Sequence, residues 1–93
     1  MEIHHEEFNS KGAFFLEDKG ARLAEMTYSK AGEDKIIIDH TEVDASLKGQ
    51  GVGKKLLDKA VNFARQNQLK IIPLCPFAKA LMHKDPSFHD VLI

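Results

Sequence analysis

This 93-residue chain has only one cysteine, few long apolar runs and almost no net charge, and each of these properties excludes a class of protein. One cysteine, Cys75, cannot form an internal disulfide, and a zinc site built on cysteines needs more thiolates. No stretch approaches the roughly 18 apolar residues of a membrane span. With 13 Lys and Arg against 14 Asp and Glu, the chain lacks the basic footprint of a general nucleic-acid binder.

These absences favour a single domain, residues 1–93, located in the cytoplasm and without a membrane or nucleic-acid partner. The N-terminal sequence MEIHHEEFNS carries acidic residues and lacks the apolar core of a signal peptide. Four of the five histidines lack the spacing of metal ligands and are expected on the surface: His4, His5, His83 and His89. No metal is therefore expected.

Glycines and prolines divide the chain into segments whose apolar periodicity predicts an α/β fold. Residues 12–18 form a short apolar run that ends in a turn signal, and residues 21–32 continue with alternating apolar positions. This pattern predicts a β-hairpin. Residues 34–45 contain three consecutive isoleucines, Ile36, Ile37 and Ile38, as expected of a central strand that is buried on both faces.

From Val52 the apolar positions recur at four-residue intervals, which predicts a helix. Residues 69–75 have the pattern of a strand, residues 76–85 that of a short helix with proline in its first turn, and residues 87–93 that of a last short strand. A strand–helix–strand crossover makes its two strands parallel neighbours. We expect a small mixed sheet with N-terminal antiparallel strands, this parallel crossover and a short C-terminal helix.

The segment SLKGQGVGKKLLDKA, residues 46–60, has three alternate glycines directly before the helix. Such a turn lets backbone N–H groups converge on an anion, and the helix N-terminus adds positive potential. The spacing does not fit a P-loop, because Lys55 stands where Ser or Thr is required, and it does not fit the dinucleotide fingerprint GxGxxG. An ordinary strand-to-helix turn is the alternative, although one glycine would suffice for it.

The strand end HTEV followed by this loop resembles the acetyl-CoA motif of the GNAT superfamily of N-acetyltransferases, Arg/Gln-x-x-Gly-x-Gly/Ala. KGQGVG, residues 48–53, fits that motif apart from Lys48 at its first position. With PLCPF, the motifs resemble a compact subgroup that carries a cysteine after the strand following the helix, and the match covers residues 36–83. The resemblance implies that the loop binds the pyrophosphate of acetyl-CoA or coenzyme A. The cofactor-binding residues that it implies are Val43, Asp44, Lys48, Gly49, Gln50, Gly51, Val52, Gly53, Lys54 and Lys55.

The resemblance also implies that the thioester lies near the C-terminal ends of the strands at residues 34–45 and 69–75. His40 and Glu42, two residues apart, share one strand face, and either could accept the proton of an acceptor amine. Cys75 could protonate the leaving thiolate or attack the thioester. The resemblance further implies that a backbone N–H near residues 43–45 stabilises the oxyanion, and Tyr28 is a weaker candidate for the acid.

Structural roles compete with each of these assignments. Cys75 could be a small buried hydrophobe, His40 a hydrogen-bonded structural residue, and Glu42 a carboxylate that faces solvent.

The function implied is an acetyltransferase that acts on an amine of an unidentified small-molecule or peptide acceptor, and a partner subunit could complete its acceptor cleft. The alternative is a non-catalytic CoA-binding module whose Cys75 forms a mixed disulfide with the cofactor. A structural or interaction domain that uses a sheet edge would leave the glycines and Cys75 unexplained.

Overall fold

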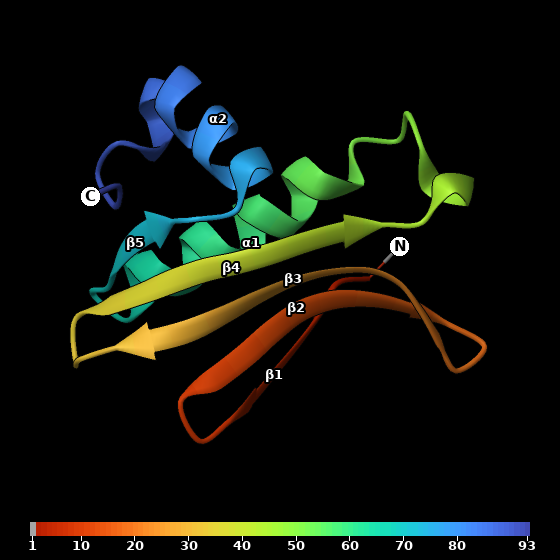
Figure 1. Cartoon of the computed structure of the whole chain (residues 1–93), viewed down its shortest axis with the longest axis horizontal. Helices are drawn as coiled ribbons and strands as arrows, with labels where there is room; N and C mark the ends of the chain where they lie inside the picture. The colour runs from red at the N-terminus through yellow and green to blue at the C-terminus, as the bar shows by residue number, and fades with distance from the viewer. Residues whose placement is uncertain (1) are drawn as a thin grey trace.

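The computed structural model describes residues 2–93 (Figure 1). Its strands are β1 (His4–Phe8), β2 (Lys11–Asp18), β3 (Ala21–Ala31), β4 (Lys35–Val43) and β5 (Lys70–Pro73). Its helices are the 3-10 helix η1 (Ala45–Leu47), α1 (Val52–Gln66), α2 (Pro76–Lys84) and the 3-10 helix η2 (Pro86–Phe88).

The five strands form one mixed sheet in the order β1-β2-β3-β4-β5. Strands β1 to β4 are an antiparallel meander, and β5 pairs in parallel with β4 after the crossover through α1. The predicted hairpin, helix and parallel crossover are confirmed, and so is the α/β class with a mixed sheet and a short C-terminal helix.

Strand β1 is an element that the sequence pattern did not predict. Its five residues are all exposed and include no apolar alternation, so they carry no periodic signal. Pairing with β2 creates the strand, and the His5 ring stacks on Phe14 with a centroid separation of 4.2 Å and meets Phe63 of α1 edge-on. Tertiary contacts therefore decide the structure of this segment.

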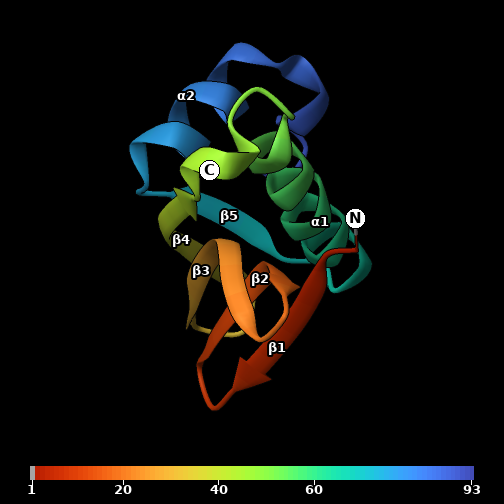
Figure 2. The same ribbon diagram turned by 90° about the vertical axis from the view of Figure 1, so that its right-hand side faces the viewer.

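Both α-helices pack on the same face of the sheet, and their buried residues join one core with the strands. Figure 2 shows α1 lying along that face. Within β4, Ile36 and Ile38 point into this core, whereas Ile37 is only half-buried on the other face, called here the open face. The prediction of a strand buried on both faces is therefore wrong, because no element of residues 2–93 covers the open face.

A β-bulge changes the direction of the side chains in the last part of β4. Tyr28 pairs with Ile38 and Thr27 with His40, so Asp39 is the extra residue. Beyond it, Thr41 pairs with the buried Met26 and therefore faces the helices.

Strands β4 and β5 stop pairing at the residue before the bulge. Their pairing ends at Ile38 and Pro73, and both Leu74 and Cys75 donate their N–H groups to the Ile38 carbonyl at 3.1 Å. The last five residues of β4 thus have no β5 partner in the described chain.

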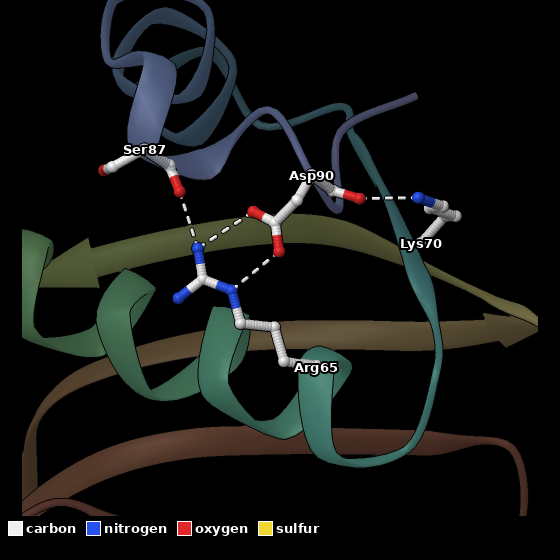
Figure 3. Close-up of polar contacts among 4 residues, drawn as sticks. All are labelled: Arg65, Lys70, Ser87 and Asp90. Atoms are coloured by element: carbon white, nitrogen blue, oxygen red, sulfur yellow. Dashed lines mark hydrogen bonds and ion pairs between the residues drawn. The ribbon is translucent and has the colours of Figure 1, made fainter.

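The C-terminal tail is tied to α1 and β5 by a polar cluster (Figure 3). Arg65 donates from Nε and Nη2 to the two Asp90 carboxylate oxygens, each at 2.9 Å, and Nη2 also donates to the Ser87 carbonyl. Lys70 Nζ donates to the Asp90 carbonyl. The predicted last strand is wrong. Residues 86–88 form η2 and the next residues form a turn, so that only Leu92 is left to form a β-bridge, with Ile71 of β5.

Candidate functional site

The glycine loop between η1 and α1 leads into a row of free backbone donors in the first turn of α1, whereas the N–H groups of Lys48 and Gln50 within the loop are bonded to Ala45 and Leu47. Gly49 and Gly51 have φ of 82° and 69°, which favour glycine, and a Cβ at either position would meet no atom within 4 Å. The first intrahelical bond of α1 joins the Lys55 N–H to the Gly51 carbonyl, so the N–H groups of residues 52–54 have no acceptor within the described chain.

The electrostatics of the loop favour an anion. The first turn of α1 contains no acidic residue, and Lys48 and Lys54 line the same hollow as Gly49 and Gly51. Lys55 lines a separate hollow with Glu2 and Asp58, so the structure does not place this predicted cofactor-binding residue beside the loop. Lys54 is partly neutralised by Asp58, whose carboxylate lies 3.2 Å from its Nζ. Free N–H groups at the positive end of a 15-residue helix form a site suited to phosphate.

A groove of about 430 Å³ runs from this loop to α2. Its apolar lining includes Val43 at the end of β4, Val52 in α1, and Phe77 and Leu81 in α2. Phe77 is 42% exposed and Val43 39%, so both present apolar surface to the groove. The groove thus has one end with free N–H groups, which is suited to an anion, and an apolar flank, as an elongated ligand with a phosphate at one end would require.

The unpaired edge of β4 borders the same region. Asp44 donates its N–H to the Leu23 carbonyl of β3 at 2.7 Å, and strand donors alternate in direction, so the N–H of Val43 points toward the β5 side. Of the predicted oxyanion donors at residues 43–45, Asp44 is therefore excluded because its N–H is occupied, and Val43 is placed at the open edge.

Cys75 is the N-cap residue of α2 and is 5% exposed. Its thiol donates to Thr41 Oγ1 at 3.2 Å. Burial alone would raise the pKa of the Cys75 thiol, but hydrogen bonds from Thr41 and from the backbone N–H groups of Ala78 and Phe77 outweigh it and lower the pKa below its ordinary value. Cys75 is thus a buried residue whose thiol loses its proton more readily than that of an ordinary cysteine.

The structure does not place the three predicted catalytic residues together. His40 and Glu42 share one face, as predicted, with His40 Nε2 3.4 Å from Glu42 Oε1 and both side chains largely exposed. They pair with Thr27 and Glu25 of β3 on the open face. Cys75 contacts Thr41 on the helix-covered face, so β4 itself separates the two groups.

The remaining candidates have structural partners. Tyr28 is buried, and its hydroxyl donates to Glu7 at 2.7 Å and lies 2.6 Å from His5 Nε2, so it points toward β1 rather than the end of β4. Burial and the Glu7 carboxylate raise its pKa. Asp44 caps η1 by accepting from the Ser46 N–H at 2.9 Å.

Thr41 and Phe77 are the residues that sequence reasoning missed. The bulge at Asp39 turns Thr41 toward Cys75, and a bulge of this kind has no signal in HTEV. Phe77 was within the quoted PLCPF but carries no chemistry of its own, and only its exposure beside the groove singles it out.

Fold and site together define an α/β protein with a glycine-rich strand–loop–helix unit beside a separating pair of parallel strands. The family model of GCN5-related N-acetyltransferases matches residues 13–91. The solution structure of a GCN5-like protein from Staphylococcus aureus is 45% identical, with a TM-score of 0.77 and coverage of 99% of this chain and 87% of that one. The chain therefore belongs to the GCN5-related N-acetyltransferase family.

More distant structures share the fold. A ribosomal-protein-alanine N-acetyltransferase from Brucella melitensis has 17% identity and a TM-score of 0.68, with coverage of 83% of this chain and 62% of that chain. A GNAT acetyltransferase from Elizabethkingia anophelis with acetyl-CoA bound has 13% identity and a TM-score of 0.63, with coverage of 81% and 52%. This chain thus spans less than two thirds of either protein. No curated protein sequence gives a significant match.

Two further properties concern residues 2–93 as a whole. No helix in this range is long and apolar enough to cross a membrane. The same range contains no group of three or more His, Cys, Asp or Glu residues arranged to hold a metal ion.

Proposed function

We propose that this chain transfers an acetyl group from acetyl-CoA to an amine. The observation that carries the proposal is the continuous path from the N–H groups of the glycine loop, along the apolar groove, to the unpaired edge of β4. Coenzyme A has the matching sequence of parts: a pyrophosphate, an extended pantetheine arm and a terminal thiol. Family membership supports acetyl transfer as the class of reaction.

The residues present fit the cofactor. N–H groups of Val52, Gly53 and Lys54 would receive the pyrophosphate, and the Lys48 and Lys54 side chains, which line the same groove, would add charge. The free edge of β4 would pair with the amides of the arm, as an added strand does. Acetyl-CoA supplies an activated thioester carbonyl.

The chain's own groups supply the remaining chemistry. The Val43 N–H would stabilise the oxyanion that forms at the carbonyl. A Cys75 with a lowered pKa could attack as a thiolate, or its thiol could protonate the departing thiolate, with Thr41 orienting the sulfur in either case. The amine must be neutral to react, so its proton needs an acceptor.

The acceptor would approach from the open face. His40 and Glu42 lie there and could take up its proton directly or through water. A hollow of about 1030 Å³ on this side is lined by residues that include Glu6, Arg22 and Asp39, which leaves room for a small amine, a peptide end or a second copy of the chain as a cover.

Calorimetric titration with coenzyme A, followed by acetyl-CoA turnover against an amine panel, tests the proposal. Gly51→Ala should weaken binding at least about tenfold, because the residue must leave φ of 69°. Gly20→Ala is the matched control, since Gly20 has φ of 81°, equally open surroundings and a position in the β2–β3 turn. Absence of coenzyme A binding at millimolar concentration contradicts the proposal.

Mutation of the chemical groups then separates their roles. Cys75→Ser, Glu42→Gln and His40→Gln should retain coenzyme A binding while turnover falls, and an acetyl adduct on Cys75 detected by mass spectrometry would identify it as the nucleophile. Unchanged turnover in all three variants would remove these residues from the mechanism.

A second function is favoured by the environment of Cys75. A thiol with a lowered pKa near the groove could exchange with coenzyme A disulfide, forming a Cys75–CoA mixed disulfide and releasing one coenzyme A thiolate. Mass spectrometry after incubation with coenzyme A disulfide should show one coenzyme A adduct that a dithiol removes and that Cys75→Ser lacks. Absence of the adduct contradicts this second function.

A further inference from the structure

The third glycine of the loop has a different surrounding from the other two. Gly53 lies inside the first turn of α1, and a Cβ there would lie 2.6 Å from Cζ of Phe77, with Cε2 and Cε1 at 3.1 and 3.2 Å. The Phe77 ring therefore occupies the space that an alanine methyl group would need. Helical geometry does not require glycine at this position, since Gly53 lacks a positive φ.

The partly exposed Phe77 ring is part of the groove surface. It is 42% exposed although it abuts the buried Gly53, and it lines the groove with Leu81 from the same helix. The outer edge of the ring thus rests against Gly53 in α1, and the rest of the ring is exposed to the groove. A large apolar surface that is supported in this way is suited to contact a ligand.

We propose that Gly53 and Phe77 form a steric pair that fixes the aromatic wall against which the pantetheine arm of coenzyme A packs. Gly53 serves the pair by lacking a side chain, and Phe77 provides the contact. The occupant follows from the groove's two ends: the wall lies between the anion-binding N–H groups and the free edge of β4, where the arm of the cofactor has to pass. This inference rests on the proposed function.

The wall also lies next to Cys75 in the chain. Phe77 is two residues after the cysteine in the first turn of α2, and its backbone N–H is one of the donors that lower the pKa of the thiol. The same turn of α2 thus carries both the ring that lines the groove and the cysteine.

Titration with two ligands tests the proposal. Phe77→Ala should raise the Kd for coenzyme A about tenfold or more, because an aromatic contact is lost, and change the Kd for adenosine 3′,5′-bisphosphate, which has no pantetheine arm, less than about twofold. Phe8→Ala, at a residue 80% exposed on β1, is the matched control and should change neither. Equal losses for both ligands, or none, would overturn the proposal.

The steric pair is tested by a double-mutant cycle read by urea unfolding and by coenzyme A binding. Gly53→Ala should lower the unfolding midpoint and weaken coenzyme A binding in the wild-type background. In the Phe77→Ala background it should leave coenzyme A binding unchanged and leave the midpoint unchanged or raise it, because alanine is the better helix former. If Gly53→Ala lowered the unfolding midpoint and weakened coenzyme A binding equally in the two backgrounds, the proposal of a steric pair would be overturned. If the wild-type chain binds neither coenzyme A nor the bisphosphate, the proposed function fails as well; if it binds both and Phe77→Ala has no effect, only this inference fails.

Discussion

Replacement of Gly12 by alanine should destabilise the fold, although alanine is generally more stable than glycine inside a strand. Gly12 is in β2 and has no positive φ, and an alanine in a strand interior is ordinarily more stable than glycine by about 0.5–1 kcal/mol. Here the ring of Tyr28 lies across the glycine, so that a Cβ would be 2.3 Å from Cζ and 2.4 Å from the hydroxyl oxygen. The tyrosine would have to move.

The cost follows from what holds Tyr28 in place. The side chain is 1% exposed, and its hydroxyl is fixed between His5 and Glu7. Overpacking costs about 1–3 kcal/mol, and each hydrogen bond lost by displacement adds about 1 kcal/mol. After subtraction of the strand preference, the net loss is about 3 kcal/mol, which corresponds to a fall in Tm of about 12–24 °C for a domain of this size.

Urea unfolding followed by circular dichroism measures this loss. In a Tyr28→Leu background, where no ring covers the glycine, Gly12→Ala should be neutral or stabilising, and this double mutant is the control. A Gly12→Ala single variant as stable as the wild-type chain would refute the reasoning, since it would show that the ring is not confined by His5 and Glu7.

Two other predictions concern titration. Thr41→Val should raise the pKa of the Cys75 thiol, because a donor to the thiolate is lost, and an unchanged profile of absorbance at 240 nm against pH would contradict this. Burial lowers the pKa of His5, and the hydrogen bond from the Tyr28 hydroxyl lowers the pKa of Glu7. Each group therefore contributes stability that is fully present above its unfolded pKa, 6.5 for His5 and 4.5 for Glu7. This stability is lost as the pH falls through the lower pKa of the folded state. His5→Gln should reduce the loss of stability just below pH 6.5, measured by urea unfolding at several pH values; an identical slope in wild type and variant would contradict it.

The sequence determined those parts of the protein that local chemistry specifies. The four-residue apolar period from Val52 predicts a helix with one buried face, which α1 confirms. The alternate glycines before it predict a turn with positive φ, and Gly49 and Gly51 have that conformation. The strand–helix–strand order similarly required a parallel pair, since a crossover has few alternatives.

Which side chains meet depends on contacts between distant parts of the chain. The bulge at Asp39 turns Thr41, instead of His40 or Glu42, toward Cys75, because one extra residue in a strand of period two exchanges its faces. Contacts across the fold also hold β1 beside β2 and seat Phe77 against Gly53. Such contacts join residues that are distant along the chain, so their effect on position and exposure leaves no periodic signal in the sequence.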